Sequence, residues 1–82
     1  MKKILYFSAT WCQPCQTLGP IMESLKGQIN YDKIDVDGDM DLPARYGVRN
    51  VPTLILLDEI GETKGRLVGL QTKDQILNFY NG

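Results

Sequence analysis

The chain has 82 residues, of which 43% are hydrophobic and 23% are charged, a composition that favours one small globular domain over a disordered or multidomain chain. We therefore expect residues 1–82 to form a single domain. Nine basic and ten acidic residues give a net charge of −1, which excludes nucleic-acid binding through bulk positive charge. The longest apolar run, residues 54–57, is far too short to cross a bilayer, and the first residues do not match a secretory signal. We expect a cytoplasmic protein that binds neither nucleic acid nor membrane.

The first part of the chain predicts a strand followed by an amphipathic helix. Residues 2–8 contain a continuous apolar run, which is typical of a strand covered on both faces. Four apolar residues then recur at the spacing of one helical face: Leu18, Ile21, Met22 and Leu25. This helix is expected to begin at two cysteines, Cys12 and Cys15, and to end near Gly27.

The middle of the chain predicts a second strand and a short helix. Residues 31–36 mix polar and apolar positions in the pattern of a strand. A helix is expected over residues 39–46, with Asp39 or Asp41 as its cap and Gly47 as its stop.

The last third predicts a hairpin and a final helix. Residues 53–57 form a second apolar run, and the connection at residues 58–62 favours an antiparallel strand over residues 63–68. Thr72 and Gln75 have the spacing of a capping box before an amphipathic helix. The predicted order of elements is β-α-β-α-β-β-α.

Cys12 and Cys15 are the only cysteines, and their spacing indicates a functional pair. A disulfide between them would close a loop of about four residues, which stabilises a fold much less than a long loop does. A catalytic or metal-binding role is therefore favoured over a structural one. Structural zinc commonly takes four Cys or His ligands, whereas this chain has two cysteines and no histidine, so zinc is the weaker alternative and we expect no metal.

The predicted position of the pair at a helix N-terminus favours thiol chemistry. The free N–H groups and the positive end of the helix dipole stabilise a thiolate on Cys12, which is the form that attacks disulfides. Cys12 is thus the predicted nucleophile and the more exposed of the two. Cys15 is the predicted resolving thiol that breaks the mixed disulfide. Trp11 is expected either to anchor this loop or to contact a partner.

The motif Trp11-Cys12-Gln13-Pro14-Cys15 resembles that of the thioredoxin family, and the resemblance extends over nearly the whole chain. Pro20 resembles the family's helix-kinking proline and Lys33 its strand lysine. Residues 46–53 resemble the segment that ends in the family's cis-proline, and residues 68–70 resemble its glycine-containing rim near the active site.

The resemblance implies an α/β fold of the thioredoxin type, with a four-stranded mixed sheet and helices on both faces. It implies a protein-disulfide reductase that uses Cys12 and Cys15, needs no cofactor, and is recycled by a thioredoxin-reductase-like flavoenzyme. Ribonucleotide reductase is an example of the protein disulfides it would reduce, and we expect a monomer. The resemblance also implies a substrate-binding surface with Pro52 in the cis form: Trp11, Gln13, Pro14, Asn50, Val51, Pro52 and Gly69.

The sequence departs from the family in four places. The usual first strand and helix are not seen, so we expect a minimal core of glutaredoxin size. Gln13 replaces a common glycine, although Pro14 still indicates a reducing dithiol, and Asn50 replaces a glycine beside the substrate groove. Tyr6 stands where many thioredoxins have a buried aspartate that helps to deprotonate the resolving cysteine. A phenol is neutral at pH 7, so we expect Tyr6 to be core and Lys33, or water beside it, to lie on the proton route.

Two other functions remain open at this point. A glutaredoxin-like reductase that uses glutathione is favoured by the short core, whereas Trp11, Pro14 and the lack of a basic cluster near the dithiol argue against it. A binding subunit without redox turnover is the other alternative, and the complete dithiol argues against it.

Overall fold

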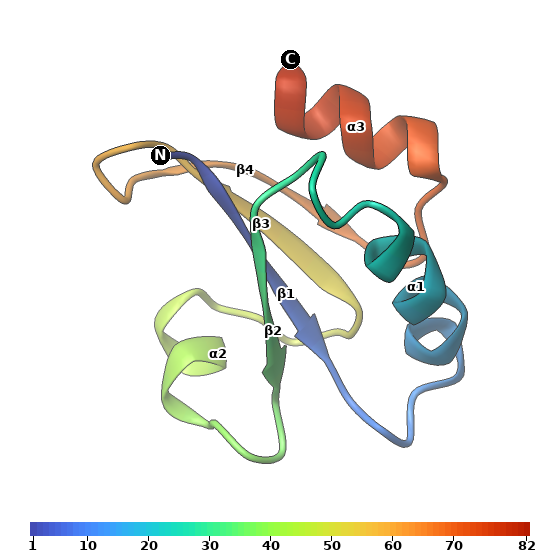
Figure 1. The fold of residues 1–82 in the computed structure, drawn as a ribbon. Coiled ribbons are helices and arrows are strands. Elements are labelled where there is room, and N and C mark those ends of the chain that lie inside the picture. Colours follow the sequence, from blue (N-terminus) through green and yellow to red (C-terminus); the bar gives the residue numbers. More distant parts are fainter.

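The computed structural model describes residues 1–82 and arranges them in the predicted order of elements (Figure 1). These are β1 (Lys3–Ser8), α1 (Gln13–Ser24), β2 (Tyr31–Asp35), α2 (Asp41–Arg45), β3 (Thr53–Leu57), β4 (Thr63–Val68) and α3 (Lys73–Asn81).

The four strands form one mixed sheet in the order β2-β1-β3-β4. Strands β1 and β2 are parallel, and α1 provides the crossover that a parallel pair requires. Strand β3 is antiparallel to both β1 and β4, so the predicted hairpin is confirmed. The expected four-stranded mixed sheet is therefore correct, and β1 lies inside it.

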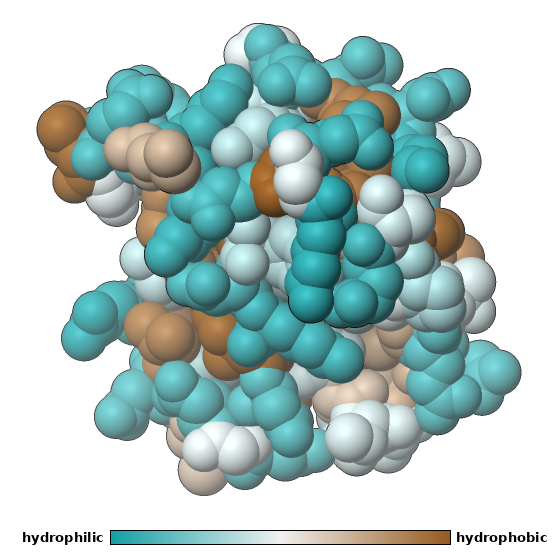
Figure 2. All heavy atoms as spheres, viewed as in Figure 1, coloured by the Kyte–Doolittle hydropathy of each residue, from teal (hydrophilic) through white to brown (hydrophobic).

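Helices cover both faces of the sheet, with α1 and α3 on one side and α2 on the other (Figure 1). Alternate residues of β1 supply the two cores: Ile4 and Tyr6 pack in the cluster under α1 and α3, whereas Leu5 and Phe7 pack on the α2 side. This double burial explains why the first strand is a continuous apolar run. On the outside, apolar residues form small separate patches, one of them at the β3–β4 turn (Figure 2).

The helix ends follow local signals in the sequence. Helix α1 ends before Gly27, which has a φ of 92°, and Pro20 lies inside it. Helix α2 is shorter than the predicted 39–46, because the Asp39 carboxylate accepts the N–H groups of Asp41 and Leu42 at 3.1 and 3.2 Å and so stays in front of the helix. None of the helices has the length and hydropathy needed to span a membrane.

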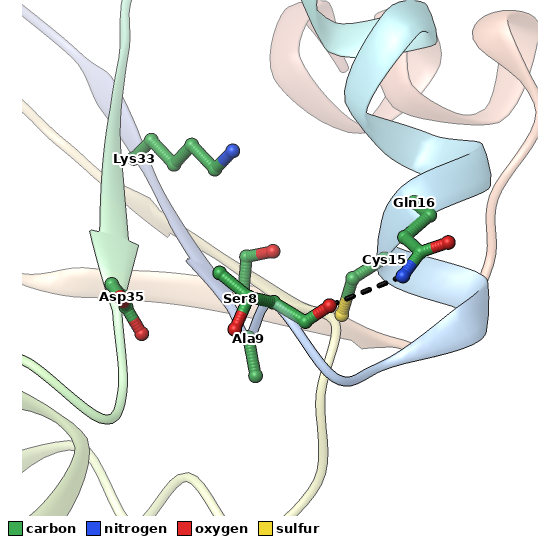
Figure 3. Close-up of a pocket in the computed structure, with 7 residues that line it drawn as sticks. Ser8, Ala9, Cys15, Gln16, Lys33 and Asp35 are labelled. Atoms are coloured by element: carbon green, nitrogen blue, oxygen red, sulfur yellow. Dashed lines mark hydrogen bonds between the residues drawn. The ribbon is translucent and has the colours of Figure 1, made fainter.

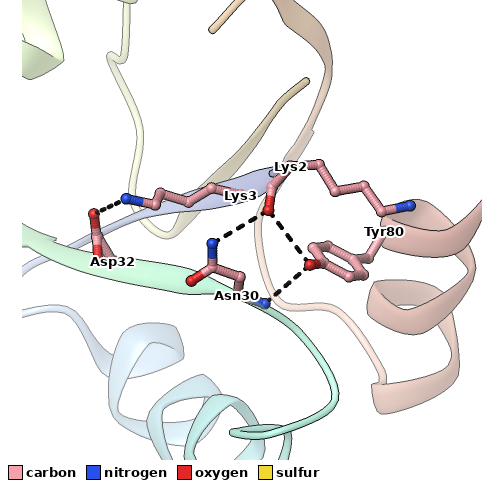
Figure 4. Close-up of polar contacts among 5 residues, drawn as sticks. All are labelled: Lys2, Lys3, Asn30, Asp32 and Tyr80. Carbon is pink, nitrogen blue, oxygen red and sulfur yellow. Dashed lines mark hydrogen bonds and ion pairs between the residues drawn. The ribbon is translucent and has the colours of Figure 1, made fainter. Parts of the chain in front are cut away.

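Helix α3 is held at both ends. At its start, Thr72 Oγ1 accepts the N–H of Gln75 at 3.1 Å and Gln75 Oε1 accepts the N–H of Thr72 at 2.8 Å, which confirms the capping box. Near its end, the Tyr80 hydroxyl accepts the N–H of Asn30 and donates to the carbonyl of Lys2 (Figure 4). The Tyr80 contacts fasten the last helix to the residues just before β1 and β2.

Candidate functional site

The two cysteines lie where the loop after β1 turns into α1. Cys12 is the N-cap residue, with extended backbone angles, and its Sγ accepts the N–H of Cys15 at 3.3 Å. Pro14 is exposed in the first turn of the helix, where its missing N–H costs nothing, and Gln13 is exposed beside it. Both thiols are free and buried, and Cys12 is only slightly more exposed than Cys15, at 5% against 3%.

Burial raises the pKa of the Cys15 thiol, and the hydrogen bond with Cys12 acts in the same direction. The backbone of Ala9 and the hydroxyl of Ser8 lower this pKa by hydrogen bonding, but they do not outweigh the burial. At neutral pH Cys15 is therefore a protonated thiol.

The segment before β3 lies directly beside Cys12. The Val51–Pro52 peptide bond is cis, as predicted, and the Cys12 thiol donates to the Val51 carbonyl at 3.5 Å. The N–H of Gly69 donates to the Pro52 carbonyl at 2.8 Å. The fold thus brings together Cys12, Val51, Pro52 and Gly69, which are far apart in the chain.

Trp11 anchors its loop, and its ring remains exposed. Its Nε1 donates to Asp37 Oδ2 at 2.7 Å, which fixes the active-site loop to the loop after β2. The side chain is nevertheless 67% exposed, so it presents an apolar face next to Cys12. Asn50 is also exposed on the segment before Pro52. Asp37 could not be identified from the sequence, because its contact with Trp11 depends on how two loops meet.

Tyr6 is buried in the core under α1, as expected. Burial is the main cause that raises its pKa, so the phenol stays neutral. Its hydroxyl donates to the Cys15 carbonyl at 3.4 Å, a contact that the sequence did not reveal. Tyr6 therefore supports the backbone of the dithiol and offers no base.

A pocket of about 490 Å³ opens beside Cys15, between α1 and β2 (Figure 3). It is lined by Ser8, Ala9, Thr10, Cys15, Gln16, Lys33 and Asp35. Lys33 extends from β2 towards α1, with its Nζ 5.9 Å from the centre of the Tyr6 ring. Across the pocket, Gln16 Nε2 donates to the Thr10 carbonyl at 3.1 Å. Lys33 thus lines the same pocket as Cys15, together with Ser8 and Asp35, which the sequence analysis missed.

No group of three or more His, Cys, Asp or Glu side chains is arranged to hold a metal ion.

Comparison with known proteins gives one consistent result. A family model described as thioredoxin matches residues 1–81. The thioredoxin of Rickettsia felis is 38% identical over 79 residues, covering 92% of this chain and 74% of the relative, and that of Haemophilus influenzae is 37% identical over 82 residues, covering 95% and 76%. The solved structure of a mutant thioredoxin from Halobacterium salinarum superposes with a TM-score of 0.90 at 41% identity, covering 98% of this chain and 72% of the other.

Proposed function

This chain belongs to the thioredoxin family and is a protein-disulfide oxidoreductase, and from that premise we propose that Cys12 is the nucleophile and Cys15 the resolving thiol. The observation that carries this assignment is the position of Cys12 Sγ at the start of α1, where it accepts the N–H of Cys15. A thiolate there is stabilised by the end of the helix.

Reduction of a substrate proceeds in two exchanges. The Cys12 thiolate attacks one sulfur of the substrate disulfide, forms a mixed disulfide, and releases the other substrate sulfur as a thiolate. Cys15 then loses its proton and attacks Cys12 Sγ, which forms the Cys12–Cys15 disulfide and releases the second substrate thiolate. Two electrons pass from the dithiol to the substrate, and each released thiolate takes a proton from solvent. We assign Lys33 to the proton route of the second exchange, because it lines the pocket beside Cys15.

The substrate segment is proposed to bind across the exposed surface around Cys12. Val51 provides its backbone next to the dithiol, and Trp11 offers an apolar face. The remaining proposed members are Gln13, Pro14, Asn50 and Gly69 at the surface, and Pro52, which is buried beneath it. Gly69 is held to Pro52 by a backbone hydrogen bond, which supports its place at the rim of the groove.

Thioredoxins are reduced by thioredoxin reductase and act on protein disulfides. We propose that a flavoenzyme of this type recycles the present protein, and that ribonucleotide reductase is the kind of disulfide it reduces. We further propose that residues 1–82 work as one domain, as a monomer, in the cytoplasm.

A paired recycling assay tests this function. Reduction of a protein disulfide such as insulin is followed in one arm with NADPH and thioredoxin reductase, and in the other with glutathione and glutathione reductase. Turnover is expected in the first arm, with none for Cys12→Ser. Turnover in the glutathione arm alone would replace the proposal with the glutaredoxin-like alternative. Full cellular function of Cys12→Ser would instead favour the binding subunit.

A further inference from the structure

The second exchange needs a group that accepts the proton of Cys15. Burial raises the pKa of this thiol, so the thiolate does not form readily at neutral pH. Tyr6 is neutral and its hydroxyl points to the Cys15 carbonyl. Lys33 carries an ammonium group, which has three donors and no acceptor. Lys33 can therefore act on the proton route only through its positive charge, and neither Lys33 nor Tyr6 can accept the proton.

Ser8 and Asp35 end two neighbouring strands beside Cys15. They are the last residues of β1 and β2 and are paired in the parallel register. Their side chains lie on the α1 face of the sheet and line the same pocket as Cys15 (Figure 3). Ser8 is only 5% exposed and lies in the pocket wall with Cys15, and its hydroxyl lowers the pKa of the Cys15 thiol.

Asp35 is held in place by the loop that follows it. Its Oδ1 accepts the N–H of Asp37 at 3.0 Å, and its carbonyl accepts the N–H groups of Gly38 and Asp39. A carboxylate has several lone pairs, so one such bond leaves it able to accept a proton. The ammonium of Lys33, two residues earlier on the same face of β2, adds a positive charge to the pocket.

We propose that Ser8 and Asp35 carry the proton of Cys15 away during the second exchange, with Ser8 as the relay and the Asp35 carboxylate as the acceptor. This inference rests on the proposed function. Many thioredoxins have an aspartate on β1 at the position of Tyr6. In this chain we assign the carboxylate of the proton route to Asp35 on the neighbouring strand, β2.

The step balances as follows. The thiol proton of Cys15 passes to Ser8 Oγ while the hydroxyl proton of Ser8 passes to the Asp35 carboxylate, directly or through a water molecule in the pocket. The electron pair left on Cys15 Sγ forms the bond to Cys12 Sγ, and the bond between Cys12 and the substrate sulfur breaks. Asp35 then returns its proton to solvent. Cys12, Tyr6, Lys33 and Asp35 are the titratable groups that face Cys15.

The two exchanges can be measured separately with dithiobisnitrobenzoate, an aromatic disulfide that releases one coloured thiolate at each step. Reduced protein and an equal amount of the reagent are mixed rapidly. The first phase of colour then reports the attack by Cys12, and the second, which is independent of protein concentration, reports the attack by Cys15. Ser8→Ala and Asp35→Asn are expected to slow the second phase at pH 7 by about tenfold or more, the scale of general base catalysis, and to leave the first unchanged.

Matched controls separate this effect from charge and packing. Asp32→Asn removes a carboxylate from the opposite face of β2, where Asp32 pairs with Lys3 at 2.9 Å, and should leave both phases unchanged. Ser8→Thr keeps the hydroxyl and should retain the second phase. In Asp35→Asn the second phase should rise about tenfold per pH unit, because hydroxide must take over the proton transfer.

Three results would overturn the relay. The first is a second-phase rate in Asp35→Asn that equals the rate in Asp32→Asn. The second is a slowing of the first phase in Ser8→Ala and Asp35→Asn that matches the slowing of their second phase. The third is a pH dependence of the second phase in Asp35→Asn that equals that of the wild type. A wild-type protein without any first phase would contradict the proposed function itself, which distinguishes that failure from failure of the relay.

Discussion

The start of α1 gives two identical thiols different surroundings. Both sulfurs lie in one small buried cluster, but Cys12 Sγ accepts a backbone N–H of the first helical turn, whereas burial and the hydrogen bond with Cys12 raise the pKa of Cys15. This difference in hydrogen bonding supports the proposed roles of Cys12 as the attacking sulfur and Cys15 as the resolving sulfur.

Alkylation should modify Cys12 before Cys15. Because burial raises the pKa of Cys15, its thiol stays protonated at pH 7 and reacts slowly with iodoacetamide, which attacks the thiolate. Raising the pH towards the pKa of Cys15 should then increase the rate at which Cys15 is alkylated. Peptide mapping by mass spectrometry of the reduced protein checks the order, with Cys12→Ser as the control. A label found first on Cys15 at pH 7 would reverse the assigned roles.

Tyr6→Phe should leave disulfide reduction within a few fold of wild type. The hydroxyl makes one long hydrogen bond to the Cys15 carbonyl, so its loss should lower the free energy of unfolding by about 1 kcal/mol or less. Urea denaturation and steady-state insulin reduction measure the two quantities. A large loss of rate at unchanged stability would mean that the hydroxyl takes part in the reaction.

The helices differ in how they are held. Helix α1 begins at the reacting thiol, and α2 has only five residues, with Arg66 of β4 donating to the carbonyls of Tyr46 and Gly47 at its end. Helix α3 depends on its capping box and on the contacts of Tyr80. Local signals start each helix, and contacts with other elements complete it.

Thr72→Ala should destabilise the protein by about 1 kcal/mol, the usual cost of losing a side-chain N-cap. The hydroxyl of Thr72 accepts the N–H of Gln75, and alanine leaves that donor without its partner. Thr72→Ser keeps the acceptor and should retain most of the stability, so it is the matched control. Both are measured by urea denaturation. Equal losses in the two variants would show that the cap contributes nothing.

The whole molecule is organised around the two inner strands of the sheet, β1 and β3. Each contributes alternate side chains to the core below α1 and α3 and to the core beside α2. The dithiol follows the end of β1, and the cis Val51–Pro52 bond lies just before β3. Packing of these strands therefore also sets the geometry of the site.

Ile55→Ala should cost about 2–5 kcal/mol, because Ile55 is fully buried in the cluster on the α2 side. The matched variant is Ile60→Ala in the β3–β4 turn, where the side chain is 78% exposed, and its effect should stay within about 0.5 kcal/mol. Chemical denaturation of both variants gives the comparison. Similar losses at the two positions would contradict the placement of the core.

The sequence by itself determined the elements and the reacting pair. Continuous apolar runs located β1 and β3, and apolar periodicity located α1. The Thr72–Gln75 spacing located the start of α3, and the Cys12–Cys15 spacing indicated thiol chemistry. These features depend on residues close together in the chain, so their signals are local. The position of Pro52 was anticipated only through the family resemblance.

The tertiary structure alone decided which distant residues meet at the dithiol. The register of β1 and β2 sets Ser8 beside Asp35, and the meeting of two loops joins Trp11 to Asp37. Strand register and loop contacts arise from packing across the sheet, and no spacing along the chain records them, because each pairing is selected by the side chains that both partners bury.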